Sequence, residues 1–221
     1  MVPRKSSQIS LGIWRIEFHP VRIYDVFRMK AAFKEWAIVV DALETGAQTI
    51  ILRKGGIAEG KGGFQIDYRS FWLFPTQFHQ QGELVEKNAQ KKYEGTAKDL
   101  PPEGIIRISS FAEVVAAYNI QNSQQIEKLE GLHIWKNKVI RERFDWGKRK
   151  DIHALAVRTY KIPNPIEIPL IDSYGGCKSW IELKPDIPIK GANPALDETA
   201  FTKVSELFHQ ALKDSKRIVL E

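Results

Sequence analysis

The hydrophobic and polar positions of this 221-residue chain predict both helices and strands. An amphipathic helix is predicted at 195–216, because apolar side chains recur there every three or four residues. The same spacing predicts a helix at 30–44, with Gly46 following at the position of a helix stop. The polar run 80–92 predicts a third helix with a thin apolar side.

Shorter apolar or alternating runs predict several strands. These runs are 49–53, 70–74, 105–118, 139–144, 152–162 and 179–183. Three prolines, Pro163, Pro165 and Pro169, interrupt regular structure after 162 and predict an extended crossing or edge segment. Several strands follow one another without a helical crossover, so the pattern favours a mixed α/β fold of the α+β type with an antiparallel-dominated sheet.

We expect the chain to divide into three parts. An N-terminal extension at 1–28 precedes a single α+β domain at 29–190, and 191–221 form a C-terminal helix packed on that domain. The extension has five Lys or Arg residues against two carboxylates, so it carries half of the chain's net charge of +6. Two interpretations of the extension stay open: Met29 is the true start, or the alternating apolar residues of 9–18 form a strand.

The composition limits the kinds of chemistry available. One cysteine, Cys177, excludes an intrachain disulfide and a multi-cysteine zinc site, and it predicts a reducing cytoplasm. We expect Cys177 to be buried, although a nucleophilic role beside Lys178 is the alternative. No apolar run approaches the roughly 18 residues that would suggest a membrane helix.

The segment Arg53-Lys54-Gly55-Gly56 is a candidate phosphate site at the end of a predicted strand. Glycines let the backbone approach an anion closely, and the two cations supply attraction. The spacing is not that of a P-loop, and the alternative is a surface turn with solvated cations.

Two further residues of this region could carry chemistry. Glu59 and His79 could act as a general acid and base, or form part of a metal site with Glu35. The alternative is that His79 is a hydrogen-bonded structural residue.

The segment 133–150 is the candidate nucleic-acid interface. Its cations would hold phosphates while an exposed aromatic ring stacks on a base. The candidate residues are Trp135, Lys136, Lys138, Arg141, Arg143, Lys148, Arg149 and Lys150. The alternative is a solvated strand face around core aromatic residues, with some cations paired to carboxylates.

A looser pattern suggests a metal-dependent nuclease. Asp172 and Glu182, with Lys184 two residues later, match an Asp…Glu-x-Lys arrangement in which the carboxylates hold Mg²⁺. A Glu-x-Lys arises by chance about once or twice in a chain of this length, so this pattern needs structural support. Magnesium is implied only under this alternative.

Four short segments resemble a known family. They are Lys34-Glu35-Trp36, Arg53-Lys54-Gly55-Gly56-Ile57, Phe74-Pro75-Thr76 with His79-Gln80, and Gly176-Cys177-Lys178-Ser179-Trp180. Over about 29–183 the chain resembles a largely cyanobacterial domain of unknown function, and this resemblance implies no activity. From the candidate sites at 53–56 and 133–150, our leading hypothesis is an RNA- or phosphate-binding module. A Mg²⁺-dependent nuclease and a protein-interaction domain are the alternatives.

Overall fold

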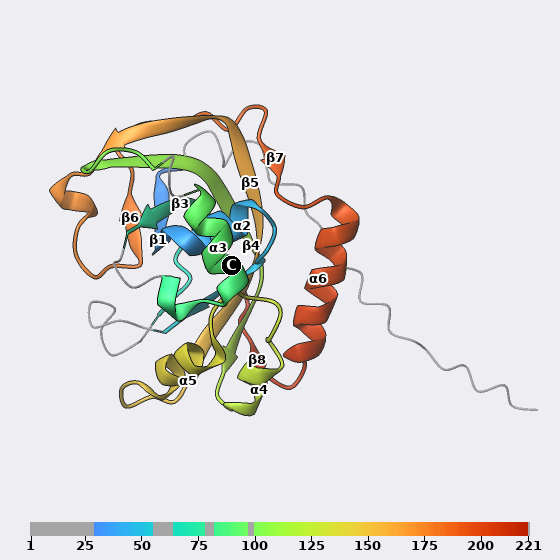
Figure 1. Ribbon diagram of the computed structural model, residues 1–221. Helices are drawn as coiled ribbons and strands as arrows, with labels where there is room; N and C mark the ends of the chain where they lie inside the picture. Colours follow the sequence, from blue (N-terminus) through green and yellow to red (C-terminus); the bar gives the residue numbers. More distant parts are fainter. Residues whose placement is uncertain (1–28, 55–63, 78–81, 97–99, 221) are drawn as a thin grey trace, which may run out of the picture.

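The protein is built around a curled sheet (Figure 1). The structure, a computed structural model, describes residues 29–54, 64–77, 82–96 and 100–220. The strand path is β2–β5–β4–β3–β1–β6, with β7 paired to β5 and β8 to β4. The strands are β1 Ala31–Trp36, β2 Ile50–Arg53, β3 Ser70–Thr76, β4 Ile105–Ile120, β5 Ile152–Pro169, β6 Trp180–Glu182, β7 Asn193–Pro194 and β8 Lys216–Arg217. Among the described strands only β1 and β3 pair in parallel, which confirms the predicted α+β class with an antiparallel-dominated sheet.

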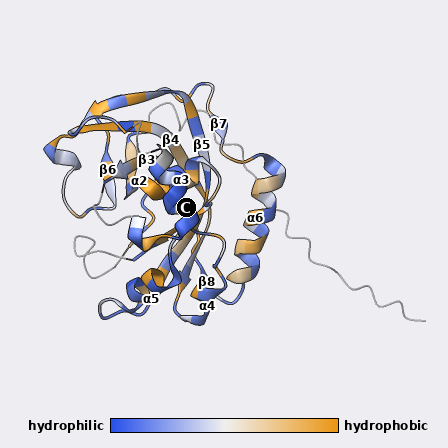
Figure 2. Cartoon of the chain, viewed as in Figure 1, coloured by the Kyte–Doolittle hydropathy of each residue, from blue (hydrophilic) through white to orange (hydrophobic). Residues whose placement is uncertain are grey.

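Helices flank this sheet. They are α2 Ala37–Glu44, α3 Lys87–Thr96, α4 Gln124–Glu127, α5 Asn137–Asp145 and α6 Glu198–Ala211, with 3₁₀ turns η2 Gly82–Leu84 and η4 Asp172–Tyr174. The helix α6 shows apolar and polar stripes along its length (Figure 2), and it buries Phe201 and Phe208. Its start is fixed by Asp197, whose carboxylate accepts the backbone N–H of Ala200 at 2.8 Å. The predicted C-terminal amphipathic helix is confirmed. In the described part of the chain no helix is long and apolar enough to cross a membrane.

Two apolar clusters form the core, and the long strands β4 and β5 run through both. The larger cluster lies under α2 and contains Phe33 and Ile51 together with Val157. The smaller one contains Trp72 and Phe111 together with Ile168. These two antiparallel strands, called the β4–β5 hairpin below, therefore supply one wall to each cluster.

The predicted helix at 30–44 is wrong over its first half. Residues 31–36 form β1, which pairs with β3 on one side and with β6 on the other, and α2 begins only at Ala37. Ala32 and Phe33 are both fully buried but belong to different clusters. A strand buried on both faces does not alternate, so the helical spacing of Phe33 and Trp36 was misleading.

The predicted strand at 139–144 is also wrong, because these residues lie in α5. The helix buries Val139, Ile140 and Phe144 and exposes Arg141. The buried positions recur with the helical period, although apolar and polar residues alternate in the sequence well enough to suggest a strand. Helical geometry places Arg143 one turn after Val139 and Arg141 on the opposite side.

The prolines after residue 162 do not end β5, which continues to Pro169. The pairing with β4 is irregular between Ser110 and Ile108, and Pro163 and Pro165 fall in this gap. Residues that lack an N–H are tolerated at such an irregularity. The N-terminal extension lies outside the described residues, so the division at Met29 stays a prediction.

Candidate functional site

The curl of the sheet brings its two ends together at Arg53. This residue ends β2, and its Nε and Nη2 donate to Ser179 Oγ at 3.1 and 3.0 Å. Ser179 directly precedes β6, which lies at the other end of the strand path, and its carbonyl accepts the Lys34 backbone N–H at 2.9 Å. Phe74-Pro75-Thr76 pairs with Lys34-Glu35-Trp36 in the parallel ladder of β1 and β3, so the described parts of all four segments that resemble a family meet in space.

Lys54 is a structural residue of this region. Its Nζ donates to the carbonyls of Phe144, Arg149 and Asp151 at 2.9, 2.5 and 2.9 Å, and lies 3.7 Å from Asp151 Oδ1. Burial lowers the pKa of Lys54, although the carboxylate of Asp151 opposes this change. The ammonium group holds the end of β2 against the turn after α5. It joins the two regions that were separate candidates in sequence, and it is fully engaged by protein groups.

A row of polar residues crosses the sheet beside this ammonium group. Arg53 pairs with His153, His153 with Asn119, and Asn119 with Lys216. Directly opposed residues of antiparallel strands point to the same face, so this row lies on one side of the sheet.

Asn119 is held in one orientation by its neighbours. Its Nδ2 lies 3.3 Å from Asp151 Oδ2 and 3.2 Å from His153 Nε2. Burial alone would raise the pKa of Asp151, but hydrogen bonds from Asn119 and Arg149 and the charges of Arg149 and Lys54 hold it below its usual value. An ionised Asp151 accepts hydrogen bonds only, so the amide must turn its nitrogen toward it.

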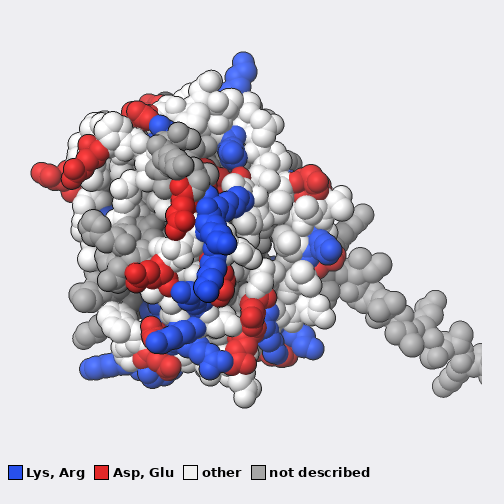
Figure 3. All heavy atoms as spheres, in the orientation of Figure 1, with Lys and Arg blue, Asp and Glu red and all other residues white. Residues whose placement is uncertain are grey.

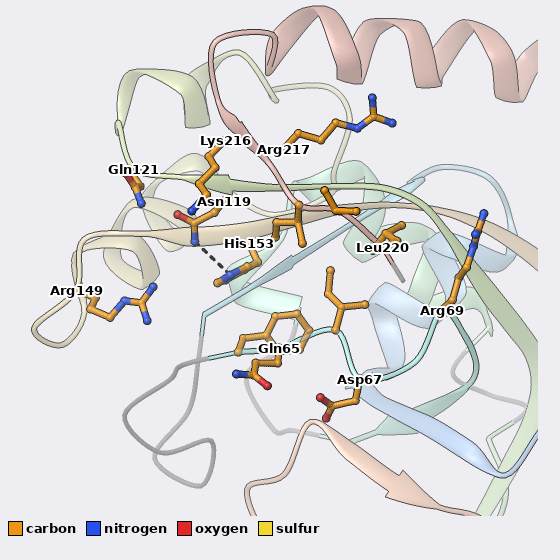
Figure 4. Close-up of a pocket in the computed structure, with 14 residues that line it drawn as sticks. Gln65, Asp67, Arg69, Asn119, Gln121, Arg149, His153, Lys216, Arg217 and Leu220 are labelled. Carbon is orange, nitrogen blue, oxygen red and sulfur yellow. Dashed lines mark hydrogen bonds between the residues drawn. The ribbon is translucent and has the colours of Figure 1, made fainter. Parts of the chain in front are cut away.

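A cavity of about 680 Å³ opens next to this row (Figure 4). It lies between residues 64–69, the ends of β4 and β5, and the C-terminal residues 216–220. In the close-up, Arg149 and Arg69 stand on opposite sides of the opening. The described residues that line it include four cations against one carboxylate, and these are Arg69, Arg149, Lys216, Arg217 and Asp67. Arg149 is paired with Asp151, and the other three cations still outnumber the single lining carboxylate, so the cavity favours an anionic ligand.

Aromatic side chains lie close to the cavity. Phe64 lines it and packs against His153, with ring centroids 5.5 Å apart. Tyr68, in the same segment, is 48% exposed, and its ring lies 5.4 Å from that of Trp180. Tyr68 does not line the cavity itself, but it lies between Asp67 and Arg69, which do.

The aromatic residues of 133–150 differ in their exposure. Trp135 is 2% exposed and packs edge-on against Trp36 at 4.7 Å, so it cannot stack on a base without leaving the core. Trp146 is 54% exposed and is available for stacking.

Most cations of this segment have partners within the protein. Lys136 Nζ donates to the Glu83 carbonyl at 2.6 Å. The remaining pairs are Lys138 with Glu142, Arg141 with Glu127, Arg149 with Asp151 and Lys150 with Asp145. Lys148 is exposed and has no such partner among the described residues. Near α5 and α4, Figure 3 shows charges of both signs interspersed. This part of the surface is therefore less electropositive than its sequence suggests.

Other candidates are placed only in part. Gly55, Gly56, Glu59 and His79 lie outside the described residues, so the predicted cleft shared by Lys54, Glu59 and His79 stays a prediction. Asp172 in η4 and Glu182 in β6 are exposed. Within the described ranges no group of three or more His, Cys, Asp and Glu residues could hold a metal ion. The expected burial of Cys177 is wrong, because this residue is exposed.

The fold and cavity define an α+β protein with a curled sheet and a basic pocket at one end. By sequence it belongs to the family described as domain of unknown function DUF1802, whose pattern matches residues 32–206. No curated protein matches the chain. Among solved structures it is similar to the ASCH protein from Zymomonas mobilis, with 12% identity and a TM-score of 0.40 over 80% of this chain and 94% of that chain. A mutant of that protein gives 13% identity and a TM-score of 0.41 over 81% of this chain and 99% of that chain.

Proposed function

We propose that the protein is an RNA-binding module that takes a single-stranded segment into the basic cavity. The observation that carries this proposal is the excess of cations over carboxylates around a cavity of about 680 Å³. Ligand pockets usually span about 300–1,000 Å³, so the cavity has room for a nucleotide.

Single strands suit this surface better than a duplex does. Proteins that bind single strands combine a basic groove with rings on which unpaired bases stack. Tyr68, which lies in sequence between the lining residues Asp67 and Arg69, and Trp146, three residues before Arg149, are both about half exposed, at 48% and 54%. Duplex readers instead place a helix or ribbon in a groove, and the short helix α5 has several of its cations paired with carboxylates.

The test is a titration of fluorescein-labelled single-stranded RNA at several salt concentrations, followed by anisotropy. Each phosphate contact contributes about −0.7 to the slope of log K against log salt for single strands. The double replacement Arg69→Gln with Arg217→Gln removes two such contacts, so it should weaken binding and flatten the slope by about 1.4. The matched control is Lys203→Gln with Lys213→Gln, which removes the same charge from exposed positions outside the cavity lining.

A slope that both double variants lower equally would show that binding follows net charge and would refute the cavity as the site. Gel analysis of the same RNA after incubation with Mg²⁺ tests the nuclease alternative, which requires shortened products. RNA that stays intact while it binds supports the binding module.

A further inference from the structure

The guanidinium group of Arg143 donates no hydrogen bond to a carboxylate or carbonyl of the described residues. Its Cζ lies 4.0 Å from the ring centroid of Trp135 and 5.3 Å from that of Trp36. Stacking on an indole fixes the plane of the guanidinium and leaves its N–H donors at the edge. The N–H groups of Arg143 are therefore held in a fixed orientation and have no acceptor in the described part of the protein.

A second guanidinium lies close by on β2. Among the described residues Arg53 donates only to the neutral Ser179 hydroxyl, and its Cζ lies 5.1 Å from the Phe33 ring centroid. Burial is the main cause that lowers the pKa of Arg143, and the charge of Arg53 lowers it further. Lys54, next to Arg53, donates to the carbonyl of Phe144, next to Arg143, at 2.9 Å, so the end of β2 lies against α5 and brings the two residues into the same region.

The negative charge nearby does not balance these cations. Glu35 opposes the lowering of the Arg143 pKa, but it is 3% exposed and its Oε1 accepts the Trp36 backbone N–H at 2.8 Å. Lys34 adds a third cation, whose Nζ is held by the carbonyls of Tyr174 and Gly176 at 2.8 and 2.7 Å. The charge of Arg53 acts against those of both Arg143 and Lys34, and a bound anion would relieve this repulsion.

We propose that Arg53 and Arg143 together bind a phosphate group where the two ends of the sheet meet. Arg143 donates through its paired N–H groups, and Arg53 contributes a second positive charge from the opposite element. Planar guanidinium groups bind phosphate oxygens in pairs, and a phosphate dianion matches two unpaired cations better than a carboxylate does. This site differs from the cavity and does not depend on RNA binding.

Phosphorus NMR and calorimetric titration of the full chain with inorganic phosphate test the proposal directly. At ten times the dissociation constant, phosphate should raise Tm by about 3–6 °C over chloride at equal ionic strength. Arg143→Met keeps the apolar contact with Trp135 but removes the donors, so it should weaken phosphate binding at least tenfold. Arg143→Lys keeps the charge without the fork and should also weaken it.

Arg141→Met is the matched control, because Arg141 lies two residues away on α5 and pairs with Glu127 at the surface. It should leave phosphate affinity within twofold. Absence of a phosphate effect on the unaltered protein overturns the proposal, and so does an equal loss in the Arg141 and Arg143 variants. The direct titration of the unaltered protein keeps the test decisive even if an Arg143 variant does not fold.

Two oligonucleotides distinguish the sources of the phosphate. If RNA with a 5′-phosphate binds more tightly than RNA with a 5′-hydroxyl, and Arg143→Met removes the difference, the phosphate is an RNA end. If inorganic phosphate binds and the RNA end makes no difference, the ligand is a small phosphate compound. If the unaltered protein binds inorganic phosphate but no RNA, the proposed function is refuted and the phosphate site is not.

Discussion

Replacing Lys54 by methionine tests whether its ammonium group serves the fold or a ligand. Methionine keeps most of the apolar stem and removes the charge and three hydrogen bonds. The side chains of Lys54 and Asp151 are each only 11% exposed, so the carbonyls and the carboxylate would lose a partner that water replaces poorly.

The structure sets the size of the effect. Removing one partner of a buried ion pair costs about 3–5 kcal/mol. We expect the lower end, about 3 kcal/mol, because Asp151 keeps its hydrogen bonds from Arg149 and Asn119. For a chain of this size such a loss lowers Tm by about 6–12 °C.

Urea unfolding, followed by tryptophan fluorescence, measures this loss. Lys150→Met is the matched control, because Lys150 pairs with Asp145 at 3.6 Å while both side chains are more than half exposed. This control should cost less than about 1 kcal/mol. A Lys54→Met protein within 1 kcal/mol of the original, or a control equally destabilised, would refute the structural role of Lys54.

Three further changes test other parts of the fold. Burial lowers the pKa of His133 to about 4. Below pH 6.5 this histidine therefore binds a proton in the unfolded chain but stays neutral in the folded chain until the pH nears 4. The stability from this histidine is complete above pH 6.5, and about 3 kcal/mol of it is lost as the pH falls to about 4. His133→Gln should remove that part of the pH dependence in urea midpoints measured at pH 7 and 4.5, and an unchanged dependence would contradict the assignment. Asp197→Ala should cost about 1 kcal/mol in urea unfolding by removing the N-cap of α6, whereas Asp197→Asn should cost much less. Tyr118→Phe should cost about 1 kcal/mol in the same assay, because the hydroxyl lies 2.9 Å from His209 Nδ1 and links β4 to α6, and a neutral result would show that this link adds nothing.

Sequence reasoning succeeded for the C-terminal helix, which has one buried and one exposed face, and its position was predicted to within a few residues. It also succeeded for the strands near 49–53 and 70–74, which are continuous apolar runs buried on both faces. It failed at β1, where both faces are covered, and at α5, whose short run fits either period. In both places packing with distant segments decided the outcome, and a local pattern does not contain that information.

The candidate site was only partly predictable for the same reason. Arg53 and Arg143 were both singled out from sequence, but their proximity depends on the curl of the sheet and on the bonds made by Lys54. Asn119 was missed, although an amide within the apolar run that ends β4 was a usable signal. The cations at 216–217 gave no signal, because the short pairing of β8 with β4 brings them to the cavity.

The β4–β5 hairpin has a consequence for how the protein comes apart. Its strands are 16 and 18 residues long, and each contributes side chains to both apolar clusters. Neither cluster can therefore unfold alone, because its loss would break the pairing of strands that also support the other cluster. We expect heat to produce one cooperative transition and amide exchange to be slowest along this hairpin, so that two cores behave as a single thermodynamic unit.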